Sequence, residues 1–308
     1  MAGAVAAGLA GCGRGPRSDP AQVPGFPRVV EHPAGRTEIP VPPARVVTAT
    51  DYDDLDAVLA VGLAPVAFGF SPWLVPDLAP WASGAAGATR LAGQVAEVSL
   101  EKIAAQHPDL IVAQADLVAD TFDELEGIAP TVTVALRSGD WRTGTRTVGL
   151  ATGREAQAAA VIARAEGVVA AAAARLADLP GRRVAVISRH GGEIQVQSAA
   201  SGRHGAGALL TDLGLVPVDP SAGAGILAEE ELSRLDDVDV LLVCDFVAET
   251  AALLSSPVYR MLRPVREGRT ALLTPTATRG GYLLSALSVE YAAGEFAGAI
   301  TAAARGAG

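Results

Sequence analysis

Arginine and aromatic residues follow the apolar runs of this sequence that are predicted to form strands. Because a guanidinium group donates paired hydrogen bonds to anionic oxygens and an aromatic ring covers apolar groups, residues of both types predict a site for a ligand that carries both. In the first half the candidates are Tyr52, Trp73 and Arg137, with Asp51, Gln114 and Trp141; in the second half they are Arg189, Arg203, Phe246, Arg279 and Tyr282, with His190. Arg189, Trp73 and Tyr52 are the strongest of them. For each residue the alternative, a solvated loop side chain or packing between the two halves, stays open.

Predicted strands alternate with predicted helices, and this alternation positions the candidates. Strands are expected at residues 45–49, 65–68, 110–113, 131–136, 183–188, 193–197, 240–243 and 271–274, helices at 53–61, 121–128 and 206–213, and a hairpin at 28–39. The short, continuous apolar runs are typical of strands covered on both faces, as in a parallel sheet. Ligands of open α/β sheets bind beyond the carboxyl ends of the strands, which is where the candidates lie.

One helix-strand unit occurs in each half. In the first, Ser99 is a good N-cap residue, Glu101 falls in the first helical turn, and Pro108 ends the helix before a buried strand. In the second, residues 228–243, Glu230 stands two positions before a leucine, as Glu101 stands two before Ile103. The repeat predicts two lobes of the same class.

Residues 153–179 are rich in alanine and contain no internal proline, so they predict one helix of up to about seven turns. The expected fold class is α/β, with two α/β lobes that have parallel-type sheets, joined by one long α-helix, and a ligand cleft between the lobes. The expected division is 1–12 signal peptide, 13–27 flexible tether, 28–152 N-terminal lobe, 153–180 connecting helix and 181–308 C-terminal lobe.

Charge excludes several classes of partner. The net charge is −10 over 308 residues and Lys102 is the only lysine, so neither nucleic acid nor an anionic membrane surface is an expected partner. No apolar run reaches the roughly 18 residues of a membrane-spanning helix. The four histidines and two cysteines are scattered without ligand spacing, which predicts no metal site.

The first twelve residues end in Leu9-Ala-Gly-Cys12, which resembles the lipobox of bacterial lipoproteins. The basic segment of an export signal is missing, so we expect the true start upstream of Met1, lipidation of Cys12, and a Gly/Pro-rich tether after it. A disordered Ala/Gly tail is the alternative. With Cys12 lipidated, Cys244 has no disulfide partner and is expected to pack as a small hydrophobe.

Four further motifs carry a family resemblance. They are Gly35-x-Thr37-x-Ile39-Pro40-x-x-Pro43-x-Arg45-Val46-Val47, Leu59-x-x-Gly62-Leu63-x-Pro65-Val66, the unit from Glu101 to Ile111, and Ile128-Ala-Pro130-Thr131-Val132. Together they resemble the iron-siderophore and cobalamin binding proteins of bacterial ABC importers. The resemblance runs from about Val29 to the C-terminus, and in the second half it concerns layout alone.

This resemblance implies a binding protein rather than an enzyme, exported and lipid-anchored at the outer face of the cell membrane, monomeric and without a cofactor. Its ligand would be a ferric siderophore held in the cleft, with limited hinge motion of the lobes. Cobalamin or haem is the alternative, and the arginines favour the anionic chelate. The resemblance also implies that Glu101 and Glu230 dock onto arginines of the permease, although a first-turn glutamate is stabilised by the helix dipole without any partner.

Two other interpretations are disfavoured. Residues 202–207 resemble a phosphate loop but have neither its glycine order nor its lysine. An enzyme could use His190 or His204 as a base near Asp245, with Ser188 or Ser198 as nucleophile. The sequence contains no G-x-S-x-G motif to hold such a serine.

Overall fold

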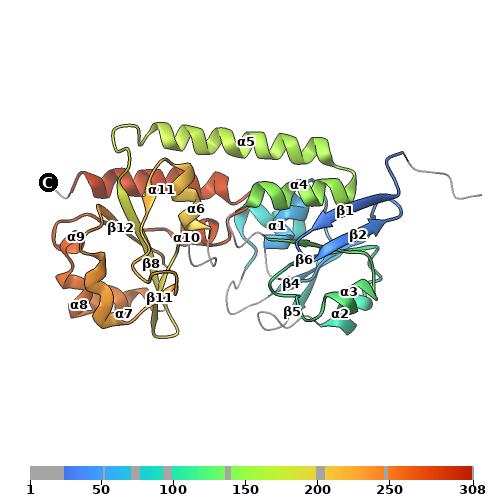
Figure 1. Cartoon of the computed structure of the whole chain (residues 1–308), viewed down its shortest axis with the longest axis horizontal. Coiled ribbons are helices and arrows are strands. Elements are labelled where there is room, and N and C mark those ends of the chain that lie inside the picture. The colour runs from blue at the N-terminus through green and yellow to red at the C-terminus, as the bar shows by residue number, and fades with distance from the viewer. Residues whose placement is uncertain are drawn as a thin grey trace, which may run out of the picture.

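The computed structural model describes residues 24–50, 53–70, 77–92, 99–135, 140–198, 205–245 and 249–306. Within them the chain forms two α/β lobes, each built around its own sheet, and helix α5 (Glu155–Ala174) lies across both (Figure 1). The predicted fold class is confirmed. The residue limits expected for the lobes stay a prediction.

The N-terminal lobe contains a five-stranded parallel sheet. Its strands are β3 (Val46–Thr48), β4 (Ala67–Phe70), β5 (Thr89–Ala92), β6 (Leu110–Gln114) and β7 (Thr131–Val134), in the order β5-β4-β3-β6-β7. The surrounding elements are α1 (Asp53–Ala60), the 3-10 helix η1 (Pro80–Ala85), α2 (Leu100–Ala104), α3 (Phe122–Glu126), α4 (Trp141–Thr152), and the hairpin of β1 (Arg28–His32) with β2 (Gly35–Ile39). All residues of β3, β4, β6 and β7 are buried, as expected for strands covered on both faces.

The C-terminal lobe contains a mixed sheet. Its strands are β8 (Arg183–His190), β9 (Glu193–Val196), β10 (Val216–Pro217), β11 (Ile226–Leu227), β12 (Val240–Val243) and β13 (Thr270–Leu272). The strands β10, β12 and β13 extend the parallel pattern from β8, whereas β9 and β11 form an antiparallel edge. The helices are α6 (Ala206–Asp212), the 3-10 helix η3 (Glu229–Leu235), α7 (Thr250–Ser255), α8 (Pro257–Met261), α9 (Arg263–Arg266), α10 (Pro275–Tyr282) and α11 (Val289–Ala304).

The repeated helix-strand unit is present in both lobes, in two forms. In α2 the Ser99 hydroxyl accepts a hydrogen bond from the backbone N–H of Lys102, as its N-cap position predicts. The second copy, η3, is a 3-10 helix rather than an α-helix. Its fully buried residues Leu232 and Leu235 are three positions apart, and residues at that spacing lie on one face of a 3-10 helix.

The connecting helix α5 is shorter than predicted at both ends. Gly153, with φ of 70°, ends the preceding helix α4 in the left-handed conformation, so α5 begins after it. By length and composition alone α5 could cross a membrane, a test that core helices also pass. One face of α5, which includes Val161, Ile162 and Val169, is buried.

A single hydrophobic cluster lies beneath α5 and continues through both lobes. It joins Val58 and Val148 of the N-terminal lobe to Leu209 and Phe296 of the C-terminal lobe. Two separate clusters cover the other faces of the sheets, one in each lobe. The lobes therefore share apolar packing on the side of α5.

Candidate functional site

Each sheet has a point where its strand order reverses direction. The expected cleft residues follow strands that end near these two points. In the N-terminal lobe the reversal lies between β3 and β6, and in the C-terminal lobe it lies between β8 and β12. Ligands of open α/β sheets bind at such points, beyond the carboxyl ends of the strands. Five of the predicted ligand-binding residues, Tyr52, Trp73, Arg137, Arg203 and Phe246, lie outside the described residues, as do Asp51 and the predicted lipidation site Cys12.

A buried aspartate ties together the strand ends at the first reversal point. The Asp54 carboxylate, at the start of α1, accepts hydrogen bonds from the backbone N–H of Thr50 at 2.9 Å and from its hydroxyl at 2.7 Å. The same hydroxyl accepts from the backbone N–H of Gln114 at 3.0 Å, at the end of β6. Sequence reasoning missed Asp54, although an aspartate in the first turn after a strand is a recognisable signal.

Arg189 lies at the end of β8 and forms an ion pair within its own lobe. Its Nη1 is 3.0 Å from Oε2 of Glu229 in η3, and its side chain is 20% exposed. The Ser256 hydroxyl donates to the other oxygen of Glu229, and this bond, followed by the contact with Arg189, lowers the pKa of that carboxyl. An anionic ligand at Arg189 would therefore share the guanidinium with Glu229.

The turn that follows Arg189 is also fixed by a carboxylate. Glu249 accepts hydrogen bonds from the backbone N–H groups of Gly191 at 2.8 Å and Gly192 at 2.9 Å, and these bonds lower its pKa. His190 is exposed at the same end of β8. The β8–β9 turn therefore has a defined shape beside the candidate arginine.

The structure brings Arg279 and Tyr282 together on α10, where the two lobes meet. Arg279 Nη1 donates to the backbone oxygen of Asp77 of the N-terminal lobe at 3.2 Å. Tyr282, which is partly buried, packs against a hydrophobic cluster that contains Leu55 and Phe68 of that lobe. Arg279 and Tyr282 therefore contribute to the packing between the two lobes.

Two other candidates are removed from the expected site. Trp141 starts α4, is fully buried in the shared hydrophobic cluster, and has the Arg142 guanidinium 4.2 Å above its ring. Gln114 is also fully buried. Their interpretation as cleft residues is wrong because the backbone turns both side chains into the protein interior.

The nucleophile expected of an enzyme is not supported by the surroundings of the two serines. Ser188 is fully buried and accepts a hydrogen bond from Gln197 at 3.2 Å. Ser198 donates to Asp219 at 2.6 Å. His204, one of the two expected bases, lies outside the described residues.

The glutamates predicted to dock onto a permease are both exposed. In the described part of the chain no hydrogen bond or ion pair reaches the carboxylate of Glu101 or of Glu230. The neighbours of Glu230 differ, because Glu229 pairs with Arg189 and Glu231 pairs with Arg234 at 2.6 Å. Figure 1 shows α2, which carries Glu101, and α8, against which η3 packs, on the side of the molecule opposite to α5.

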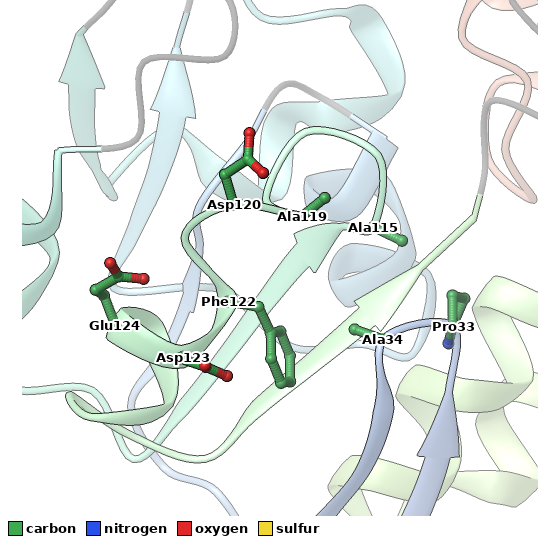
Figure 2. Close-up of a pocket in the computed structure, with 8 residues that line it drawn as sticks. All are labelled: Pro33, Ala34, Ala115, Ala119, Asp120, Phe122, Asp123 and Glu124. Carbon is green, nitrogen blue, oxygen red and sulfur yellow. The ribbon is translucent and has the colours of Figure 1, made fainter.

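A cavity of about 490 Å³ lies in the N-terminal lobe, between the β1–β2 turn and the segment after β6 (Figure 2). Pro33, Phe122 and three alanines form its apolar wall, and its carboxylates are Asp120, Asp123 and Glu124. An acidic wall repels an anionic chelate, and none of the predicted ligand-binding residues lines this cavity. Among the described residues no group of three or more His, Cys, Asp or Glu side chains could hold a metal ion.

Comparisons with known proteins agree over most of the chain. Residues 46–277 match a family described as periplasmic binding protein. The chain is 30% identical over 116 residues to the probable siderophore-binding lipoprotein YfiY of Bacillus subtilis (strain 168), which is 37% of this chain and 35% of that relative. It therefore spans about a third of the length of this curated relative.

Solved structures match this chain over most of its length. A periplasmic solute binding protein from Mycobacterium smegmatis str. MC2 155 has a TM-score of 0.75 at 26% identity, covering 89% of this chain and 97% of that chain. Staphylococcus aureus SirA complexed with staphyloferrin B has a TM-score of 0.73 at 23% identity, covering 86% and 96% of the two chains. The fold similarity thus includes both lobes.

Proposed function

This chain belongs to the periplasmic binding protein family, and we propose that it captures a ferric siderophore between its two lobes and delivers it to the permease of an ABC importer. The observation that carries the proposal is the two-lobe fold, which matches 96% of SirA, a protein that binds staphyloferrin B in its solved complex. The name of YfiY, a probable siderophore-binding lipoprotein, supports the same ligand class. The family consists of binding proteins rather than enzymes, and we extend this to the present chain.

The proposed ligand site combines the strand-end residues of both lobes. In the N-terminal lobe it includes Tyr52, Trp73 and Arg137, and in the C-terminal lobe Arg189, Arg203, Phe246, Arg279 and Tyr282. A ferric chelate presents carboxylate, catecholate or hydroxamate oxygens, for which arginine is the best-matched donor. At Arg189 the ligand oxygens take the place of the Glu229 carboxylate or share the guanidinium with it.

The proposed docking residues are Glu101 and Glu230. Both residues are exposed, one on each lobe, whereas the carboxylates of Glu229 and Glu231 pair with arginines of the same lobe. An exposed carboxylate without an internal partner is free to pair with an arginine of another protein. This favours Glu230 over its two neighbours.

The proposed location is the outer face of the cell membrane. Cys12 would carry the lipid, and residues 13–27 would be the tether between the lipid and the first strand. YfiY is named a lipoprotein, which supports this arrangement. We expect the protein to act as a monomer.

A fluorescence titration tests the ligand class. The purified protein is mixed with ferric hydroxamate, catecholate and carboxylate siderophores, with cobalamin and with haemin, while tryptophan emission is recorded. Saturable quenching by at least one ferric siderophore, and none by the metal-free chelator at the same concentration, is the expected result. Quenching by cobalamin or haemin alone would replace the siderophore with a tetrapyrrole, and quenching by none of these ligands would overturn the proposal.

A further inference from the structure

A buried carboxyl group lies between the two lobes. Asp56 of α1 is 2% exposed, and its Oδ2 accepts hydrogen bonds from Trp81 Nε1 at 2.8 Å and from Ser285 Oγ at 2.6 Å. Trp81 belongs to η1 of the N-terminal lobe, and Ser285 lies between α10 and α11 of the other lobe. One oxygen atom therefore links both lobes.

The direction of both hydrogen bonds is fixed by their donors. An indole N–H can only donate. The Ser285 hydroxyl accepts from the backbone N–H groups of Leu287 at 3.3 Å and Ser288 at 3.0 Å, so its lone pairs are used and its proton points to Asp56. A proton bound by Asp56 must consequently reside on Oδ1.

Among the described residues, few charged groups surround Asp56. Arg279 of α10 acts on it electrostatically, and Asp54 of α1 is turned toward Thr50. In the first turn of α11, Glu290 pairs with Arg164, and the ring of Tyr291 lies 5.2 Å from that of Trp81. Neither η1 nor residues 283–288 contain a titratable side chain, and Tyr282 packs in the adjoining apolar cluster.

Burial disfavours the ionised carboxylate of Asp56 more than the surrounding hydrogen bonds and charge favour it. It raises the pKa of the carboxyl to about 7, although the hydrogen bonds from Ser285 and Trp81 and the charge of Arg279 all favour the ionised form. Separation of the lobes at this point would hydrate Asp56 and let it ionise at a lower pH. By linkage, rising pH favours the separated arrangement.

We propose that Asp56 is a proton-controlled clasp between the lobes: the neutral carboxyl stabilises the contact between Trp81 and Ser285, and its ionisation favours opening of that contact. Because Asp56 accepts hydrogen bonds from one residue of each lobe, opening of the clasp would change the relative position of the lobes at this point. The proposed role of Asp56 does not depend on the identity of the ligand.

The indole resonances of the ligand-free protein test the clasp. In ¹H–¹⁵N spectra recorded from pH 5 to 9, the Trp81 indole signal, assigned by its loss in Trp81→Phe, should shift with a midpoint near pH 7. The shift should vanish in Asp56→Asn. In Ser285→Ala, which removes a donor that favours the ionised form, the midpoint should rise by about one pH unit. Thr301→Ala is the control, because it removes a hydroxyl of α11 that donates to Ala297 of the same helix, and its midpoint should stay unchanged.

Hydrogen exchange tests the coupling to the lobes. The backbone amides of Leu287 and Ser288, which donate to Ser285, should be less protected at pH 8 than at pH 6 after correction for intrinsic rates. In Asp56→Asn the protection should be equal at the two pH values. A wild-type Trp81 signal that does not titrate between pH 5 and 9, or protection that is the same at both pH values in the wild type, overturns the proposal. Neither measurement involves a siderophore, so their failure is separate from that of the proposed function.

Discussion

The guanidinium of Arg189 lies 3.0 Å from the carboxylate of Glu229, so the arginine ranked first as a ligand contact has an anionic partner within its own lobe. This pair is partly exposed, and such pairs contribute at most about 1 kcal/mol to stability. The ion pair is therefore weak enough to exchange its carboxylate for a ligand oxygen. It also holds the long arginine side chain in one position at the end of β8.

Replacing Arg189 with alanine should weaken ferric siderophore binding at least about tenfold, because a charge-assisted hydrogen bond contributes about 1.5–3 kcal/mol. The melting temperature should change little. Glu229→Gln is the matched control: it removes the competing charge and should keep or increase the affinity. Titration by tryptophan fluorescence measures both variants, and equal affinity of wild type and Arg189→Ala would remove Arg189 from the site.

Reversing both exposed carboxylates, Glu101→Lys with Glu230→Lys, should abolish uptake of the ligand in cells and leave its affinity in solution intact. The reason is that like charges would face the arginines expected on the permease. A control with the same change in net charge is Glu38→Lys with Asp178→Lys, at exposed positions away from α2 and η3. Uptake of labelled ferric siderophore is the measurement. If the two double variants support equal uptake, Glu101 and Glu230 are ordinary helix-start residues.

The contribution of Asp56 to the free energy of unfolding should fall as pH rises from about 4 to 7. Burial raises the pKa of this group from 3.8 to about 7, so between these values the folded state holds a proton that the unfolded state has lost. The stabilisation is complete below the unfolded pKa and is lost as pH passes the folded one. Urea unfolding at several pH values, compared with Asp56→Asn, measures this contribution. A difference between the two proteins that stays constant from pH 4 to 7 would contradict it.

Helices α4 and α5 approach closely at Gly149, where an added Cβ would lie 2.6 Å from the Cβ of Ala158. Gly149→Ala should therefore destabilise the protein by about 1–3 kcal/mol through overpacking. Gly167→Ala, in α5 with open space around the added atom, should instead stabilise it by up to about 1 kcal/mol. Denaturant unfolding of both variants measures these changes. Equal changes in the free energy of unfolding, with the same sign, would show that helices α4 and α5 can move apart freely.

The lipid anchor predicts a simple fractionation result. Protein expressed from its own gene should partition with membranes and incorporate labelled fatty acid, and Cys12→Ala should release it to the soluble fraction. Ser18→Ala, in the proposed tether, is the control and should remain with the membranes. A soluble, unlabelled wild type would remove the anchor from the proposal.

The sequence predicted strands better than helices. Short, continuous apolar runs such as the one in β12 are typical of strands buried on both faces, and the structure contains strands at or next to the predicted positions. Helix α4 was missed because its threonines and glycines are weak helix formers, and its burial against α5 is a tertiary effect. The 3-10 form of η3 also depends on packing, since the two leucines that it buries fit either type of helix.

The candidate site was harder to predict for a related reason. Asp54 and Asp56 look in the sequence like exposed first-turn aspartates, yet both are buried with specific donors. Trp141 follows a predicted strand, as a cleft residue would, but the backbone turns its ring into the interior. Sequence order indicates which end of a strand a residue follows, whereas the direction of its side chain depends on elements far away in the chain.

The hydrophobic cluster beneath α5 sets a limit on how the protein can be divided. Because Val148 and Phe296 belong to one continuous core, cutting the chain at α5 would expose the inner face of each half to water. Each lobe has its own sheet, but neither has a complete core of its own. We therefore expect the two lobes to unfold together in one transition, despite the two-fold repeat of the architecture.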